Sequence, residues 1–182
     1  FGYAGSLGTW YSEPIIKRFI QFVYKYSTSS EFIFLLNNSI TEWKDFISEE
    51  QLEKNRFHIK SVSYEQIPDE FQHIDIGFFF ITPSYSKIAS CPTKMGEMLA
   101  AGIPIITGHL IGDVDEIIAK YNIGYVVKDF TEEEFKKAGD YVMNMLKTER
   151  ESLIKRCRQA AEENFSLEKA VDKYAEIYNG LL

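Results

Sequence analysis

Short runs with the pattern of strands, most of them rich in apolar residues, alternate with amphipathic stretches along nearly the whole chain. The runs occupy residues 1–5, 31–37, 57–62, 76–81, 103–107 and 124–129, and in residues 57–62 apolar and polar side chains alternate. Between them, apolar residues recur at the three-to-four-residue spacing of a helix. Strands that are apolar on both faces are typical of parallel sheets covered by helices on both sides. The sequence therefore predicts an α/β fold, a doubly wound parallel sheet, followed by a helical carboxyl-terminal tail.

Composition sets the outer limits on function. The chain has 182 residues, 45% of them hydrophobic, and no linker or internal repeat, so we expect a single domain over residues 1–182. The net charge of -7, with no basic stripe, argues against a nucleic-acid partner. No run approaches the roughly 20 apolar residues of a membrane span. The two cysteines, Cys91 and Cys157, have no metal-ligand spacing, which favours reduced thiols in a cytoplasmic protein.

Polar residues that cap helices mark several predicted boundaries. Ser12, followed by Pro14, is typical of a helix start. Thr131 with Glu134 and Thr148 with Glu151 have capping-box spacing, so each pair predicts a new helix. The last helix is expected to begin after a cap and to carry an apolar stripe; the residues concerned are Ser166, Val171, Tyr174, Ile177 and Tyr178.

The predicted sheet also indicates where a ligand would lie. In the common strand order 3-2-1-4-5-6, ligands bind outside the carboxyl ends of the strands, where strands one and four are neighbours. The loop at residues 5–12 (GSLGTWYS) follows strand one. It is neither a G-x-G-x-x-G fingerprint nor a Walker A loop. Its glycines allow close approach of the backbone to an anion, and they are equally consistent with a plain tight turn.

The loop after strand four leads into a helix through the sequence SCPTKMGE. Pro92 is predicted as the first helical residue, where its missing N–H is not needed. Thr93 and Lys94 would then offer N–H groups, a hydroxyl and an ammonium to a diphosphate. Glu97, four residues after Thr93, lies on the same helix face and could accept both hydroxyls of a ribose. The alternative is an exposed Glu97 paired with Lys94.

For the remaining acidic, cysteine and histidine residues that could have a catalytic or metal-binding role, the sequence favours structural roles. Asp113 and Asp115 have the spacing of a metal-binding Asp-x-Asp, but they open a helix, where a cap is the stronger interpretation. Cys91 lies beside a helix start without a neighbouring histidine, which argues against a nucleophile. The histidines form no pair; His109, close to the expected crevice, is the weak candidate among them. No metal site is predicted.

Beyond these local patterns, residues 90–106 (SCPTKMGEMLAAGIPII), residues 111–127 and the opening FGYAGSLGTWY resemble the carboxyl-terminal half of retaining GT-B glycosyltransferases of the glycosyltransferase 4 type. The resemblance runs through essentially the whole chain. It implies a Rossmann-like domain, one half of a GT-B fold, that binds a nucleotide-sugar. It also implies that an acceptor-binding domain, absent from this chain, precedes it.

The resemblance implies roles for individual residues. Those expected to contact the nucleotide-sugar are Ser6, Leu7, Gly8, Ser61, Val62, Ser90, Thr93, Lys94 and Glu97. The first three would lie near the pyrophosphate, and the next two would grip the base through their backbone. Glu97 matches the second acid of the family's Glu-x7-Glu motif, which holds the ribose. Lys94 and Glu97 are the expected catalytic residues.

One departure from the motif is clear. The first acid would fall at position 89, where this chain has Ala89, and Ser90 or Lys87 would have to replace its contact to the donor sugar.

The implied activity is transfer of a sugar from a UDP-, GDP- or ADP-linked donor to a glycan or lipid-linked acceptor, as in polysaccharide or surface-glycan synthesis. No cofactor or metal is expected, and the chain alone is expected to be inactive. It would be cytoplasmic, with any attachment to the inner face of the membrane made by the missing half. The alternatives are a non-catalytic nucleotide-binding module and a GT-B-type sugar epimerase domain.

Overall fold

The computed structural model describes residues 1–8, 10–82 and 84–181. Its centre is a six-stranded sheet in the order β3-β2-β1-β4-β5-β6, and every pairing is parallel. The strands are β1 (Gly2–Ala4), β2 (Phe32–Leu35), β3 (Phe57–Lys60), β4 (Gly77–Phe79), β5 (Ile105–Gly108) and β6 (Gly124–Val127). Each lies in one of the predicted strand runs, except that β5 extends one residue beyond its run, to Gly108. The predicted doubly wound α/β fold and its strand order are therefore confirmed.

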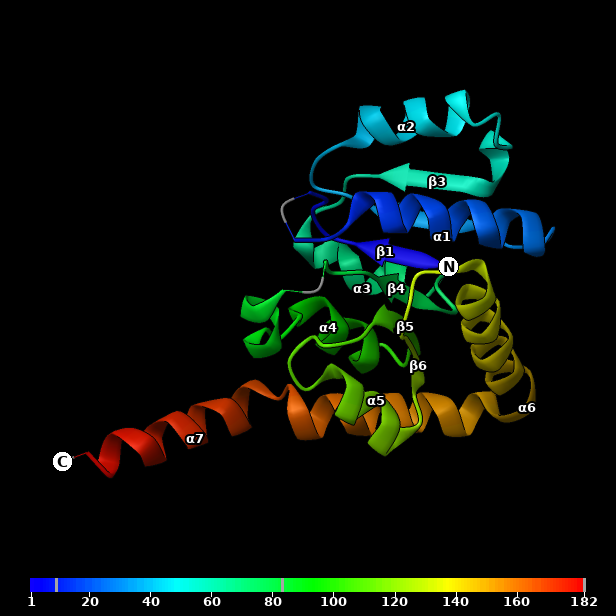
Figure 1. The fold of residues 1–182 in the computed structure, drawn as a ribbon. Coiled ribbons are helices and arrows are strands. Elements are labelled where there is room, and N and C mark those ends of the chain that lie inside the picture. Colours follow the sequence, from blue (N-terminus) through cyan, green and yellow to red (C-terminus); the bar gives the residue numbers. More distant parts are fainter. Residues whose placement is uncertain (9, 83, 182) are drawn as a thin grey trace.

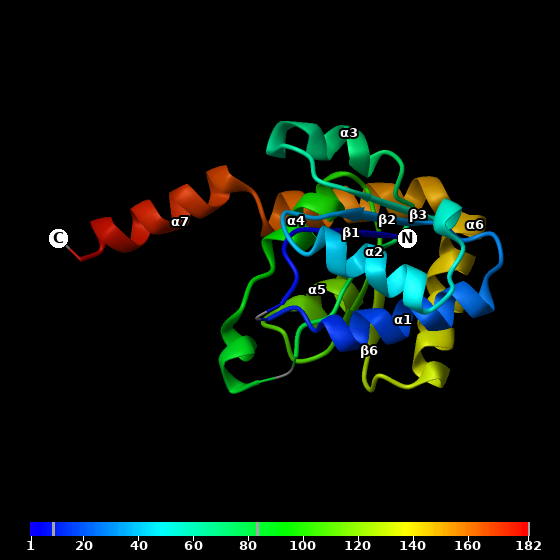
Figure 2. The same ribbon diagram turned by 90° about the horizontal axis from the view of Figure 1, so that it is seen from above.

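Helices cover both faces of this sheet. They are α1 (Glu13–Tyr26), α2 (Ile40–Glu49), α3 (Ile67–Phe71), α4 (Thr93–Ala100), α5 (Val114–Tyr121), α6 (Glu132–Asn164) and α7 (Leu167–Asn179). In the view from above, α1 and α2 lie on one side of the strands and α3 on the other (Figure 2). Three 3-10 turns, Lys54–Arg56, Tyr64–Gln66 and Tyr85–Ala89, complete the connections.

The long helix α6 joins the two halves of the sheet. Near its start, the Phe135 ring packs edge-on against Phe19 of α1, with the ring centroids 5.3 Å apart. Beyond a kink at Glu149 (φ -145, ψ 33), its second part runs beside α4 (Figure 1). Phe165, just after α6, lies so close to Gly96 that a Cβ at position 96 would be 2.8 Å from the Phe165 ring. The packing of α6 therefore helps to fix α4.

The new helix predicted after Thr148 is present beyond a kink at Glu149, but its predicted Thr148 cap is not formed. The Thr148 hydroxyl donates a hydrogen bond of 2.8 Å to the carbonyl of Asn144, one turn back in the same helix. No backbone N–H is recorded as donating to this hydroxyl among the described residues. Two helical segments meet at Glu149, whose backbone is non-helical (φ -145, ψ 33).

The other predicted caps are mostly confirmed. Thr131 accepts a hydrogen bond from the N–H of Glu134, and Ser166 accepts one from the N–H of Lys169. The Glu134 side chain accepts from the N–H of Lys128 rather than completing a capping box. Ser12 is the N-cap residue of α1 without a side-chain cap hydrogen bond.

The final helix stands apart from the sheet. All residues of α7 are described and none is buried, so the apolar stripe predicted for it faces outward. Both views show α7 extending away from the rest of the chain (Figures 1 and 2). Among the described residues, no helix combines the length and apolarity needed to cross a membrane.

Candidate functional site

The loops after β1 and β4 lie side by side at the carboxyl edge of the sheet. β1 and β4 are neighbours, with Gly2 opposite Gly77. Beyond the strands, the N–H of Ser12 donates to the carbonyl of Phe80 at 2.8 Å, and the N–H of Thr82 donates to Trp10 at 3.2 Å. The predicted switch point is therefore present, and main-chain hydrogen bonds hold its two loops together.

The loop after β1 contains the predicted residues Ser6, Leu7 and Gly8. Gly5 (φ 114) and Gly8 (φ 93) have left-handed backbone conformations that favour glycine. The Leu7 N–H donates to Asn38 Oδ1, and Asn38 Nδ2 donates to the Leu7 carbonyl, both at 3.0 Å. Sequence reasoning missed this clamp. The available signal was an amide side chain, both donor and acceptor, just after the strand beside β1.

Helix α4 begins one residue later than predicted. Pro92 is its N-cap residue, with an extended backbone (φ -74, ψ 105), and not its first helical residue. The Pro92 carbonyl accepts a hydrogen bond from the N–H of Met95 at 3.0 Å. Thr93 opens the helix and is exposed, as is Glu97 one turn later. Both therefore remain accessible to a ligand.

Lys94 has the most unusual environment of the predicted site residues. Its side chain is buried, with 6% exposed, and its Nζ lies 3.4 Å from the ring centroid of Tyr11 and 4.0 Å from that of Tyr3. The structure records no hydrogen-bond partner for this Nζ among the described residues. Burial lowers the pKa of Lys94 to about 7, against an opposing effect of the Glu97 charge. No ion pair joins Lys94 to Glu97 among the residues described, so the predicted alternative of a surface pair is not observed.

The remaining predicted contacts lie farther along the same edge. Ser61 and Val62 follow β3, which is separated from β1 only by β2. At the usual spacing of neighbouring strands this is about 10 Å. Ser90 lines a separate pocket of about 280 Å³ together with Cys91. Lys94 thus approaches the β1–α1 loop directly, whereas Ser61, Val62 and Ser90 lie to either side.

The loop at Ser90 is held by its neighbour after β5. Gly112 donates its N–H to the carbonyl of Lys87 at 3.0 Å. A Cβ at position 112 would lie 2.0 Å from the Ser90 carbonyl oxygen, and the φ of Gly112 is +46. Only glycine permits this approach, so the two loops pack as one unit.

The residues for which the sequence favoured structural roles, Asp113, Asp115 and Cys91, have local structural explanations. Asp113 is the N-cap residue of α5, and Asp115 Oδ2 accepts a hydrogen bond of 3.4 Å from the N–H of Leu110. Burial, followed by the charge of Asp113, raises the pKa of the Cys91 thiol, the opposite of what a nucleophile needs. The described residues contain no group of three or more His, Cys, Asp or Glu side chains that could hold a metal ion.

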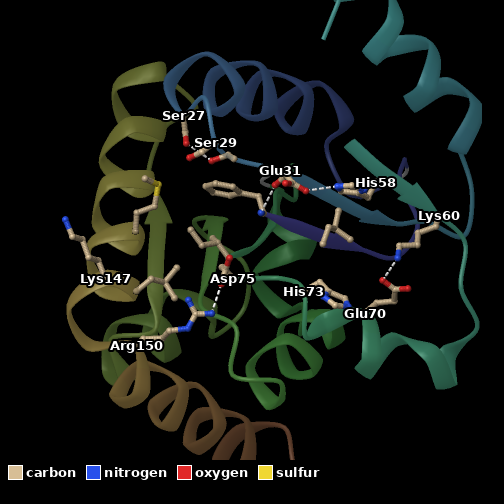
Figure 3. Close-up of a pocket in the computed structure, with 16 residues that line it drawn as sticks. Ser27, Ser29, Glu31, His58, Lys60, Glu70, His73, Asp75, Lys147 and Arg150 are labelled. Carbon is tan, nitrogen blue, oxygen red and sulfur yellow. Dashed lines mark hydrogen bonds and ion pairs between the residues drawn. The ribbon is translucent and has the colours of Figure 1, made fainter. Parts of the chain in front are cut away.

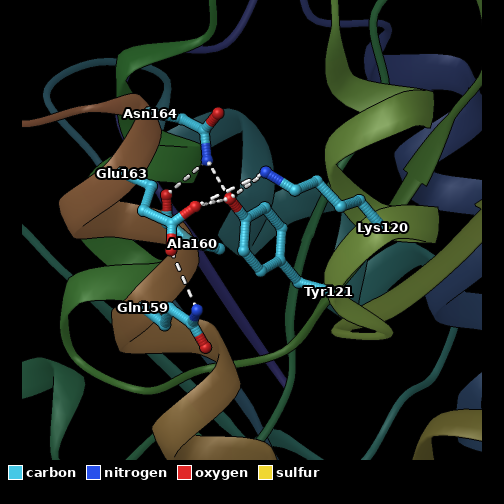
Figure 4. Close-up of polar contacts among 6 residues, drawn as sticks. All are labelled: Lys120, Tyr121, Gln159, Ala160, Glu163 and Asn164. Carbon is cyan, nitrogen blue, oxygen red and sulfur yellow. Dashed lines mark hydrogen bonds and ion pairs between the residues drawn. The ribbon is translucent and has the colours of Figure 1, made fainter.

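A cluster of polar side chains joins α5 to the end of α6 by hydrogen bonds (Figure 4). The Tyr121 hydroxyl donates to the Glu163 carboxylate, and Gln159 Nε2 donates to the same carboxylate at 2.8 Å. Lys120 donates to the Tyr121 oxygen at 2.7 Å. These hydrogen bonds, that of Tyr121 first, lower the pKa of Glu163 to about 2. The cluster is structural in character because its charged groups satisfy one another.

A larger cavity lies at the opposite edge of the sheet (Figure 3). It has a volume of about 790 Å³ and includes Phe1, Glu31 and Asp75, which precede β1, β2 and β4. Its charges are mostly paired with one another, as in His58–Glu31 at 2.7 Å and Arg150–Asp75 at 2.6 Å. Ligands of doubly wound sheets bind at the carboxyl ends, and the Lys94 Nζ there has no recorded partner among the described residues, so the site at Lys94 is the stronger candidate.

The histidines lie outside that candidate site. His58 and His73 line the amino-edge cavity. His109 lines another pocket, of about 560 Å³, with Asp115 and Tyr141. None of the three is brought to Lys94.

Known structures share this fold. A glycosyltransferase from Rickettsia africae superposes with a TM-score of 0.75 at 20% identity, covering 97% of this chain and 47% of that one. HepE from Anabaena, solved in complex with UDP, gives a TM-score of 0.72 at 15% identity, with coverage of 99% and 49%. The pneumococcal O-GlcNAc transferase GtfA, in complex with UDP and GlcNAc, gives 0.67 at 14% identity, with coverage of 99% and 35%. The fold is that of one half of a GT-B glycosyltransferase.

Sequence comparison gives the same family. Spore coat protein SA of Bacillus subtilis (strain 168) is 33% identical over 84 residues, which is 45% of this chain and 22% of that protein. The chain thus spans about half the length, or less, of these relatives. The model of the family described as glycosyl transferases group 1 matches residues 38–163, well over half of the chain. The chain therefore belongs to the glycosyl transferases group 1 family.

Proposed function

We propose that this chain binds the donor of a retaining glycosyltransferase, with the nucleoside diphosphate at the carboxyl edge of the sheet. The observation that carries the proposal is the buried Lys94 ammonium, which has no recorded partner among the described residues and lies between the start of α4 and the β1–α1 loop. An unneutralised buried cation is unfavourable unless an anion completes the site. A diphosphate supplies that charge.

The neighbouring groups suit the rest of a nucleotide. The first N–H groups of α4 favour an anion at that helix end, and the clamped backbone at Ser6, Leu7 and Gly8 can approach it closely. The exposed Glu97 carboxylate is available to accept the ribose hydroxyls. The backbone at Ser61 and Val62 would then meet the base. In this arrangement the nucleotide runs along the strand ends from β4 toward β3.

The chemistry required of these residues is mainly electrostatic. When the glycosidic bond to the diphosphate breaks, negative charge builds up on the leaving phosphate oxygens. Lys94 and the helix end stabilise that charge more in the transition state than before it, which lowers the barrier. Glu97 keeps the nucleotide in register. These groups carry the charge without a metal ion, so we propose a metal-independent reaction.

The relatives guide the choice of ligand. Two of the similar structures were solved with UDP, which makes UDP the first nucleotide to test, before GDP and ADP. The similarity to a spore coat protein supports a role in surface-glycan or polysaccharide synthesis. The acceptor, a glycan or lipid-linked sugar, would be bound by a further domain. The isolated chain is accordingly proposed to bind donor without transferring sugar.

Calorimetric titration of the chain with UDP, GDP and ADP, in the presence of a chelator, tests the proposal. One nucleotide is expected to bind, and Glu97→Ala to weaken it about tenfold through lost ribose contacts. Glu49→Ala, an exposed carboxylate in the last turn of α2, is the matched control and is expected to change nothing. Binding that is equal in both variants would contradict the assignment, as would binding that requires a divalent metal.

A further inference from the structure

Two adjacent aromatic residues of the β1–α1 loop each cover a lysine that follows β4. The Lys87 Nζ lies 3.4 Å from the Trp10 ring centroid, and the Lys94 Nζ lies 3.4 Å from that of Tyr11. Neither lysine takes part in an ion pair among the described residues. The two contacts differ in depth, because Trp10 is 53% exposed whereas Lys94 is buried.

The Tyr11 ring is fixed where it meets Lys94. The main-chain N–H of Tyr11 donates to the carbonyl of Gly8 at 3.1 Å, and the Tyr11 backbone pairs with Ile81 in an antiparallel bridge. Its ring packs edge-on against Tyr3 and Phe79, with centroid distances of 6.1 and 6.4 Å. A ring held on three sides cannot move aside without disturbing the loop, so its position over Lys94 is set by the fold.

The ammonium of Lys94 is therefore enclosed but not neutralised. Two aromatic faces attract a cation, and this offsets part of the unfavourable burial. They provide no hydrogen-bond acceptor for its three N–H donors. Gly5 also borders the ammonium, because a Cβ there would lie 3.1 Å from the Nζ. A ligand oxygen bound at the backbone of this loop would lie close to these donors.

We propose that Tyr11 is a positioning residue that keeps the Lys94 amino group buried without a counter-ion, so that binding of a diphosphate favours its protonated form. This inference deepens the proposed function, and its ligand half rests on that function. Tyr11 acts through Lys94 and needs no contact with the nucleotide.

The direction of the proton transfer follows from the groups that face Lys94. These are Tyr3 of β1, Tyr11 of the loop and Glu97 of α4. In the ligand-free chain, burial holds the pKa of Lys94 at about 7, below its ordinary 10.5. A bound diphosphate stabilises the ammonium and raises the pKa. At a pH between the pKa of Lys94 in the ligand-free chain and its higher pKa in the complex, binding takes up a proton. UDP binding therefore weakens as the pH rises above about 7.

Two measurements on three variants test the inference. The first is an NMR titration of the ligand-free chain with isotope-labelled lysine, in which Lys94→Met identifies the Lys94 signal. The second is calorimetric titration with UDP in buffers of different ionisation enthalpy, which counts the protons taken up. Tyr11→Phe keeps the ring, and no hydrogen bond of the Tyr11 hydroxyl is recorded among the described residues. Tyr11→Leu removes the ring, and thermal unfolding checks that each variant is folded.

The expected results separate a positioning role from a purely structural one. Lys94 should titrate well below the other lysines in the wild type and in Tyr11→Phe. In Tyr11→Leu, water reaches the amino group past the smaller side chain, and because burial is the main cause of the lowered pKa, this outweighs the lost attraction of the ring. Lys94 should then titrate nearer to the other lysines. UDP binding should take up as much as one proton in the first two proteins, clearly less in Tyr11→Leu, and none at this residue in Lys94→Met. A Lys94 that titrates with the other lysines in the wild type would overturn the inference, as would one that is unchanged by Tyr11→Leu. If none of UDP, GDP and ADP binds the wild type, the proposed function fails, and the ligand-free titration still decides the role of Tyr11.

Discussion

The side-chain amide of Asn38 and the backbone of Leu7 exchange two hydrogen bonds of 3.0 Å, which tie the end of β2 to the loop after β1. The Asn38 side chain thus helps to hold the β1–α1 loop in its conformation. These two hydrogen bonds do not involve Lys94, which lies next to the same loop. Residues that contact no ligand can therefore affect affinity at this site.

Asn38→Ala tests that role. Both hydrogen bonds are lost, and because each contributes about 1 kcal/mol, we expect the free energy of unfolding to fall by about 1–2 kcal/mol. Ordering the freed loop on binding should weaken UDP affinity about fivefold. Urea denaturation and calorimetry measure the two effects. The control is Asn37→Ala, an exposed neighbour; an equal effect there would argue against the clamp.

Two glycine substitutions should change the free energy of unfolding in opposite directions. Gly112→Ala places a Cβ 2.0 Å from the Ser90 carbonyl oxygen and forces alanine into a left-handed backbone. The backbone conformation alone costs about 1–2 kcal/mol, and the clash displaces the Ser90 loop. Gly139→Ala, within α6, meets nothing within 4 Å and should stabilise the chain by about 0.5–1 kcal/mol. Urea midpoints measure both, and a neutral Gly112→Ala would contradict the packing described.

The α5–α6 cluster predicts a pH dependence of stability. The folded-state pKa of Glu163, about 2, lies below its ordinary 4.5, mainly because of the Tyr121 hydrogen bond. The stabilisation is therefore fully present above pH 4.5 and lost as the pH falls toward 2. Tyr121→Phe should lower the melting temperature near neutral pH and differ less from the wild type in acid. A difference that stays constant across this range would show that Glu163 titrates normally.

The fold was largely predictable, and the reasons are local. Continuous apolar runs such as residues 76–81 have few alternatives to a buried strand, and alternation with helices predicts parallel pairing. The exact ends of the helices were less predictable. Pro92 lies one position from its predicted place, and the helix predicted after Thr148 begins beyond a kink at Glu149 without the predicted cap. A local motif does not show which nearby groups a hydroxyl will bond to.

The site was only partly predictable. The local pattern places Lys94 and Glu97 at a helix start, where they stay predicted site residues, but no local pattern indicates that Tyr3 and Tyr11 cover Lys94. Asn38 and Leu7 are 31 positions apart. Such contacts arise when the strand order brings distant loops together, so no pattern along the chain carries them.

Cys91 should behave as an unreactive thiol. It is exposed, but burial of the sulfur and the nearby Asp113 charge raise its pKa, so little thiolate forms near neutral pH. Alkylation by iodoacetamide should be slower than that of a free cysteine, and Cys91→Ser should bind UDP like the wild type. Rapid alkylation near neutral pH, lost in Cys91→Ser, would reopen the possibility of a reactive thiol.

The most direct measurement is a crystal structure of the chain with UDP bound. We expect the diphosphate at the start of α4, with an oxygen within hydrogen-bond distance of Lys94 Nζ and the ribose hydroxyls on Glu97. UDP bound instead in the 790 Å³ cavity at the amino edge, among Glu31, His58 and Arg150, would contradict the central claim.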